Sequence, residues 1–175
     1  MVLCAPMIDI STIQLKGTRA RARFLSEVGG CLGLARQYTP GGQDLPLDLG
    51  DFESNQLTSD RDRFQRTCLV LQAAPQLGLG SATIGWLRAA LRSIARMTAP
   101  DYPLRVEVPL LMYAAGRDTI VSTEAIENFA AKLKVGTHIL IPDSKHEILQ
   151  ETDAVRQRFW TAFDAYLGVE NDAAA

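Results

Sequence analysis

The sequence predicts an α/β protein in which about three parallel strands are flanked by helices. Three short apolar runs, each closed by proline or glycine, have the composition of strands buried in a parallel sheet: residues 2–5, 109–115 and 138–141. The second and third runs alternate with segments of helical period at 122–134 and from 153 onward. This order, with its short connections, predicts a parallel unit with right-handed crossovers.

The first apolar run begins at Val2, almost at the start of the chain. A central strand normally has neighbours on both sides, and the residues that precede it usually supply them. We therefore expect this chain to be only the C-terminal part of a larger sheet. The amides and carbonyls of its first strand, with apolar Val2 and Leu3, are expected to be open to self-association or to a complementary N-terminal segment.

The residues between the first two runs are mostly helical in pattern, and we expect them to form a cap inserted into the sheet domain. One helix is predicted over 14–37, although glycines weaken its second half. Its core stripe comprises Phe24, Val28, Cys31, Leu32 and Ala35. An irregular loop follows over 38–57, of the length expected of a lid or binding segment.

Two further helices are predicted in this insertion. The first begins near residue 60, with Thr58 or Ser59 as its N-cap. Its apolar stripe comprises Phe64, Cys68 and Leu71, and the stripe of the helix over 83–97 comprises Ile84, Leu87, Leu91 and Ile94.

The two helices of the C-terminal module have stripes of their own. These stripes comprise Ile126, Phe129, Ala130 and Leu133 in the first helix, and Val155, Phe159, Phe163 and Leu167 in the second. The expected organisation is therefore a core of residues 1–11 and 101–169, a cap of residues 12–100, and a disordered tail at 170–175.

Composition restricts the class of partner. The chain has 175 residues, 47% hydrophobic and 22% charged, which suits one ordinary globular domain. Its net charge of −2 gives no general attraction to nucleic acid or to an anionic membrane. Arg19, Arg21 and Arg23 form a local basic cluster, and a solvated helix face beside Phe24 is preferred to a phosphate-binding strip.

Cysteine usage gives no sign of a metal or a disulfide framework. The three cysteines, Cys4, Cys31 and Cys68, are odd in number and far apart, and neither His138 nor His146 has a cysteine near it. We expect no metal and no cofactor, and we expect reduced, buried thiols in a cytoplasmic protein that is at most peripheral at membranes. Residues 1–10 read neither as a signal peptide nor as a membrane span.

Two residues follow successive predicted strands at the edge where catalytic groups of parallel sheets gather. Asp118 lies just past the second strand, and His146 lies in the loop past the third. An aspartate there can fix the imidazole tautomer and stabilise the imidazolium that forms when histidine removes a proton from a nucleophile. Taken singly, Asp118 is more often a turn former and His146 an ordinary loop residue. Asp9, after the first strand, is a rival acid.

Five segments resemble the α/β-hydrolases of the lysophospholipase and monoacylglycerol-lipase type, a branch related to the S33 serine aminopeptidases. Residues 116–121 (GRDTIV) resemble the acid loop, and residues 144–151 (SKHEILQE) are similar to the histidine loop. Residues 55–60 with Arg63 resemble a cap segment. The remaining matches are 85–90, similar to a cap helix, and 2–7, similar to the strand after the nucleophile helix.

The resemblance implies the C-terminal part of an α/β-hydrolase fold and a serine hydrolase of lipid carboxylic esters, with Asp118 as acid and His146 as base. The family's G-x-S-x-G nucleophile turn is absent from these residues, and so are its oxyanion-hole donors. Ser81 lacks a preceding strand, and Ser144 shares the histidine loop. We therefore expect the chain alone to be inactive.

Two alternatives remain open. The chain could be a non-catalytic hydrolase remnant that acts as a binding or interaction module. The complete protein could also perform another reaction of the same fold, as aminopeptidases, epoxide hydrolases and haloperoxidases do.

Overall fold

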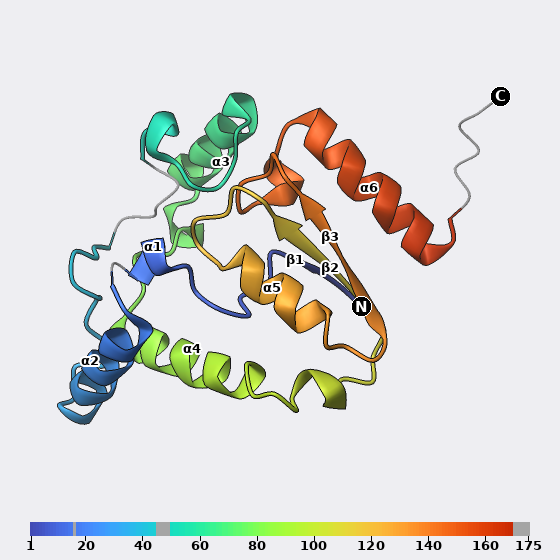
Figure 1. Ribbon diagram of the computed structural model, residues 1–175. Helices are drawn as coiled ribbons and strands as arrows, with labels where there is room; N and C mark the ends of the chain where they lie inside the picture. Colours follow the sequence, from blue (N-terminus) through green and yellow to red (C-terminus); the bar gives the residue numbers. More distant parts are fainter. Residues whose placement is uncertain (16, 45–49, 170–175) are drawn as a thin grey trace.

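One open parallel sheet lies at the centre of the protein (Figure 1). The computed structural model describes residues 1–15, 17–44 and 50–169, so the predicted tail at 170–175 lies outside the described residues. The strands are β1 (Val2–Cys4), β2 (Leu110–Ala115) and β3 (Gly136–Ile141), in the order β1-β2-β3. Both pairings are parallel, which confirms the predicted class.

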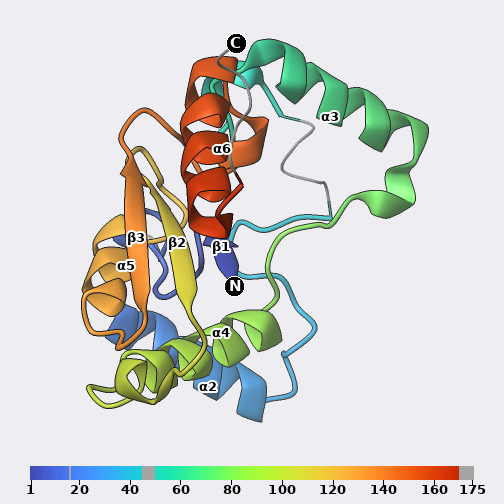
Figure 2. The same cartoon turned by 90° about the vertical axis from the view of Figure 1, so that its right-hand side faces the viewer.

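Helices α5 (Thr123–Ala130) and α6 (Asp153–Leu167) cover opposite faces of the sheet (Figure 2). The whole of β2 is buried, and successive side chains of a strand point to opposite faces. One face of β2 therefore packs against α5, through Leu110, Met112 and Ala114. The other face packs against α6, through Leu111, Tyr113 and Ala115. This two-sided burial explains why the strand has no alternating polar residue.

The predicted ends of two elements were wrong. Helix α5 stops at Ala130 rather than continuing to residue 134, and β3 begins at Gly136 rather than at His138. The parallel register explains both differences, because Gly136 already pairs with Leu110 and the chain has to turn before it. In α6 the predicted stripe is buried at Val155 and Phe159, whereas Leu167 in the last turn is exposed.

The segment between β1 and β2 contains most of the remaining helices. They are α1 (Thr12–Leu15), α2 (Arg19–Cys31), η2 (Phe52–Ser54), α3 (Arg61–Ala73), η3 (Pro75–Leu77), α4 (Ile84–Met97) and η4 (Pro103–Arg105). The predicted face of α4 is confirmed, since Leu91 and Ile94 are buried in a cluster with Ile10, just beyond β1. None of the helices among the described residues is long and apolar enough to cross a membrane.

The prediction for α2 was wrong. The helix ends at Cys31, and its apolar stripe faces outward, with Phe24 66% exposed and Leu32 70% exposed. Its buried positions are Ser26 and Gly29. A Cβ on Gly29 would lie 3.0 Å from Ile84 Cγ2, so α4 packs against α2 where the latter has no side chain. Close approach of two helices, rather than burial of an apolar stripe, determines which face of α2 is inside.

Two smaller expectations also need correction. Asp60, not Thr58 or Ser59, is the N-cap of α3, because its side chain accepts a hydrogen bond from the Arg63 amide. The cysteines are not all buried: Cys4 and Cys31 are exposed and Cys68 is half-buried. Cys4 is uncovered because β1 pairs with β2 alone among the described residues.

Glu27 of α2 forms ion pairs with Arg88 and Arg92 of α4, both at 2.7 Å. Hydrogen bonds from Arg92 and then Arg88 lower the pKa of the Glu27 carboxyl from 4.5 to about 2. A carboxyl whose pKa is lower in the folded chain than in the unfolded chain stabilises the fold at pH values above its unfolded pKa. This contribution is lost as pH falls from about 4.5 toward 2. We expect thermal melts of Glu27→Gln to lose less stability over that interval than the unmodified chain. Parallel curves would contradict this expectation.

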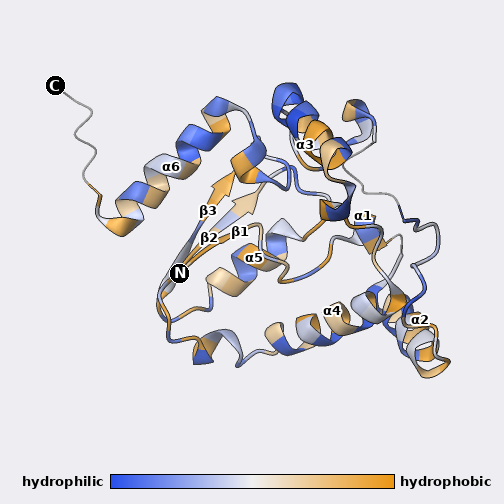
Figure 3. Cartoon of the chain, turned by 180° about the vertical axis from the view of Figure 1, so that it is seen from behind, coloured by the Kyte–Doolittle hydropathy of each residue, from blue (hydrophilic) through white to orange (hydrophobic). Residues whose placement is uncertain are grey.

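Hydropathy is distributed as this layering requires (Figure 3). The strands are mostly hydrophobic, apart from the first half of β3, whereas the helices around them carry both hydrophobic and hydrophilic residues. Helix α3 lies at the end of the sheet toward which the strand arrows point (Figure 1), and this is the end at which Asp118 and His146 were expected.

Candidate active site

The acid loop follows β2 directly and is held by its own aspartate. Asp118 Oδ1 accepts hydrogen bonds from the amides of Ile120, at 2.8 Å, and Val121, at 3.0 Å. These bonds form an Asx turn, a geometry that aspartate favours because its side chain reaches the backbone two residues on. The carboxyl group is fully buried, so one oxygen is fixed and the other, Oδ2, faces the next loop.

That second oxygen meets the histidine loop. His146 Nδ1 lies 2.7 Å from Asp118 Oδ2, and the imidazole side chain is 25% exposed. The acceptor is a carboxylate oxygen, which assigns the proton to Nδ1. The lone pair of Nε2 is then free, and no group among the described residues bonds it. The predicted meeting of the two side chains is therefore observed.

The parallel register brings these loops together. Ala115 pairs with Ile141 at the last position of β2 and β3, so the strands end side by side. The next two amides continue the contact: Gly116 donates to Ile141 O at 2.9 Å, and Arg117 donates to Ser144 O at 2.9 Å. Backbone bonds thus fix the distance between the acid loop and the histidine loop.

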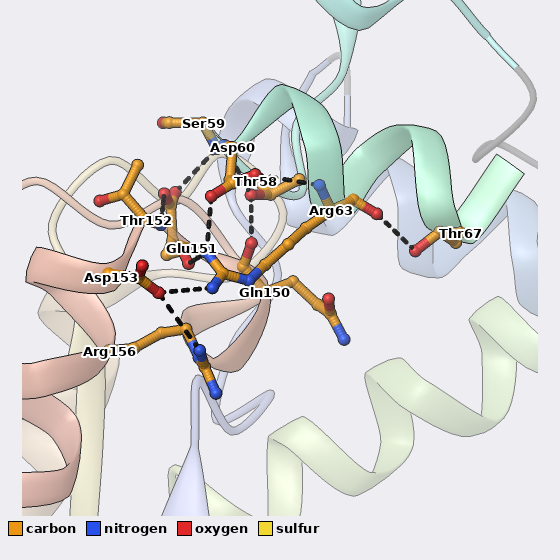
Figure 4. A network of polar contacts seen from close by, with 10 residues as sticks. All are labelled: Thr58, Ser59, Asp60, Arg63, Thr67, Gln150, Glu151, Thr152, Asp153 and Arg156. Atoms are coloured by element: carbon orange, nitrogen blue, oxygen red, sulfur yellow. Dashed lines mark hydrogen bonds and ion pairs between the residues drawn. The ribbon is translucent and has the colours of Figure 1, made fainter.

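A second set of contacts joins the histidine loop to residues 55–63 (Figure 4). Thr58 Oγ1 donates to Gln150 O at 2.6 Å, and Arg63 Nη1 donates to Glu151 O at 2.7 Å. The sequence indicated both segments separately but did not predict that they bind one another. The contacts of Glu151 were also missed, because this residue lies two positions before α6 and nothing in the sequence indicates which amides its carboxylate bonds.

The other candidate residues lie elsewhere. Asp9 is buried, but its carboxylate forms an ion pair with Arg19 and accepts the Ile10 amide, so it does not meet His146. Ser144 is buried and donates its hydroxyl to Lys145 O, while Ser81 accepts the Gln43 amide. Neither serine is placed as a nucleophile for His146.

The basic cluster is solvated, as predicted, with Arg19, Arg21 and Arg23 all exposed. Arg23 also borders an open cleft of about 470 Å³ that includes Arg92 and Arg96 of α4 and neither Asp118 nor His146. Within the described ranges, no three His, Cys, Asp or Glu side chains are grouped as metal ligands.

An aspartate and a histidine in contact beyond the carboxyl ends of an open parallel sheet agree with the α/β-hydrolase class. Comparison with known proteins agrees with this class. The model of the family described as serine aminopeptidase S33 matches residues 1–153. The chain belongs to the S33 serine aminopeptidase family of α/β-hydrolases.

This chain matches only a part of the length of its curated relative. The chain is 28% identical over 119 residues to the probable lysophospholipase L2 of Haemophilus influenzae, which is 68% of this chain and 37% of the relative. The chain thus spans little more than a third of the curated relative that it matches.

Three solved structures share the fold at low sequence identity. A monoglyceride lipase from Saccharomyces cerevisiae has a TM-score of 0.66 at 19% identity, with 95% of this chain and 54% of that chain covered. The monoacylglycerol lipase of Paleococcus ferrophilus has a TM-score of 0.62 at 16% identity, with 97% of this chain and 58% of that chain covered. A carboxyl esterase from Bacillus coagulans has a TM-score of 0.59 at 12% identity, with 95% of this chain and 55% of that chain covered. The chain therefore corresponds to a little over half of each fold.

Proposed function

We propose that this chain supplies the acid and base of a serine hydrolase that cleaves carboxylic esters of lipids, such as lysophospholipids or monoacylglycerols. The observation that carries the proposal is the 2.7 Å contact between His146 Nδ1 and Asp118 Oδ2. The relatives support the substrate class, because their names are lysophospholipase, monoglyceride or monoacylglycerol lipase, and carboxyl esterase.

In the proposed reaction, a serine from outside these residues attacks the acyl carbonyl. His146 Nε2 takes the serine proton and then gives it to the departing alcohol, which leaves an acyl-enzyme that water hydrolyses by the same route. Asp118 keeps the imidazole in the required tautomer and stabilises its protonated form. The 175 residues contain no G-x-S-x-G, so we propose that the chain alone does not hydrolyse esters.

The proposal gives residues 12–100 the role of a cap that shelters the acyl chain, and it places the protein in the cytoplasm. It also gives the edge of β1 a partner. Within the described residues β1 pairs with β2 alone, so the other edge of this strand is available to a complementary N-terminal segment or to a second copy.

The reading frame upstream of Met1 is the first test, and we expect it to continue in frame into G-x-S-x-G. The chain extended by that segment is then assayed with a lysophospholipid, a monoacylglycerol and an aminoacyl-naphthylamide, and is treated with a fluorophosphonate probe that labels activated serines. We expect ester hydrolysis and labelling of the extended chain, with neither in the 175-residue chain.

Each other outcome has a definite meaning. Labelling of the 175-residue chain would reveal a nucleophile among its own serines. Preference for the naphthylamide would assign the protein to peptide rather than ester hydrolysis. An upstream frame without a nucleophile turn would favour the non-catalytic binding module.

A further inference from the structure

Glu151 is a fully buried glutamate whose carboxylate is bonded by backbone amides. Oε1 accepts from Ser59 N at 3.1 Å and from Lys145 N at 2.9 Å, and Oε2 accepts from Thr152 N at 3.2 Å. Burial of a carboxylate is costly unless hydrogen bonds replace its water, and three amides do so here. Figure 4 shows this side chain between the start of α3 and the start of α6.

Two of the three amides connect Glu151 to the backbone around His146. Lys145 directly precedes the histidine, and Glu151 follows the short helix η5 (Ile148–Gln150), so this bond closes the histidine loop on itself. Ser59 belongs to the segment before α3, so the same oxygen also attaches that segment to the loop.

The residues on either side of His146 are bonded to the same segment. Lys145 Nζ donates to Asn55 O at 2.9 Å, and Glu147 N donates to Leu57 O at 2.8 Å. The imidazole itself has one hydrogen bond, to Asp118, within the described residues. Its direction therefore depends on a backbone that residues 55–59 and Glu151 hold in place.

We propose that Glu151 is a positioning residue, which holds the histidine loop against residues 55–59 so that His146 Nδ1 keeps its contact with Asp118. This inference rests on the proposed function for its catalytic meaning, since the Asp118–His146 pair is the proposed acid and base. Glu151 acts through Lys145 and does not touch the reacting atoms.

Glu151→Gln is the informative change because it keeps the shape of the side chain. An amide has one acceptor oxygen, so at least one of the three N–H groups then faces an NH₂ donor. Thr152→Pro tests the same contact from the donor side by removing one amide. The φ of Thr152 is −53° and the ψ of Glu151 is 173°, and both angles suit proline and the residue before it.

The measurement is side-chain ¹H–¹⁵N NMR on the ¹⁵N-histidine-labelled chain. The sequence has only two histidines, so His138 serves as an internal control. In the unmodified chain we expect His146 as the Nδ1–H tautomer with a slowly exchanging proton. In Glu151→Gln we expect exchange about tenfold faster, the effect of one lost hydrogen bond, with some transfer of the proton to Nε2. In Thr152→Pro, which leaves both Oε1 bonds in place, we expect a smaller change in the same direction.

Two control variants separate positioning from general loosening. Glu53→Gln makes the same charge change on an exposed glutamate that pairs with Arg61, and Glu27→Gln weakens the α2–α4 contact. Neither is expected to alter the His146 signals. Unchanged His146 signals in both folded test variants, or equal changes at His138, would overturn the proposal. This readout needs no turnover, so it stays separate from a failure of the proposed function.

Discussion

Asp118→Asn is expected to lower the kcat of ester hydrolysis by about 10⁴-fold in the chain extended by its nucleophile segment. The asparagine keeps the shape of the side chain but can present an NH₂ group to His146 Nδ1, which favours the tautomer that carries its proton on Nε2. His146→Ala should cost more, about 10⁶-fold, because it removes the base itself. The measurement is kcat and KM for each variant, and KM is expected to change little.

Two aspartates provide the controls for this result. Asp143→Asn changes an exposed residue that directly precedes the histidine loop and pairs with Arg158, and it should leave kcat near the unmodified value. Asp9→Asn tests the rival acid. A larger loss of kcat in folded Asp9→Asn than in Asp118→Asn would transfer the role of the acid to Asp9, despite its pairing with Arg19.

Gly116→Ala is expected to destabilise the protein by about 1–3 kcal/mol, the usual cost of overpacking. A Cβ at this position would lie 2.6 Å from Pro142 O and 2.7 Å from Pro142 Cα. These are backbone atoms, and the bond from Gly116 N to Ile141 O prevents the two chains from moving apart freely. Thermal or urea unfolding measures the loss.

The neighbouring Arg117→Ala is the matched control, because Arg117 is exposed and its change should alter stability by no more than about 0.5 kcal/mol. An equal melting temperature for Gly116→Ala and the unmodified chain would show that the ends of β2 and β3 can separate without cost. That outcome would also remove the reason for the fixed distance between Asp118 and His146.

The sheet and the Asp118–His146 contact could be predicted because both follow from local rules. An uninterrupted apolar run indicates a strand buried on two faces, and parallel strands bring the loops after them to one edge. The buried face of α2 was predicted wrongly because it depends on contacts between distant parts of the chain. A hydrophobic stripe predicts a buried face only when another element covers it, and the contact of Gly29 with Ile84 depends on a helix more than fifty residues away.

The role of Glu151 could not be obtained from sequence for a similar reason. Its three donors come from Ser59, Lys145 and Thr152, and the first of these is remote in the chain. No periodicity or spacing records which amides a buried carboxylate meets. The residue types were visible, but their meeting required the folded chain.

The attachment of residues 55–63 to residues 145–153 has a consequence for protein engineering. It applies to chimaeras in which the segment between β1 and β2 is exchanged with that of a homologue. Here a graft that extends beyond Asn55 and replaces Thr58 and Arg63 would also remove the partners of Gln150 and Glu151. An exchange of this segment therefore has to retain the host's residues 55–63 if the bonds to the histidine loop are to be kept.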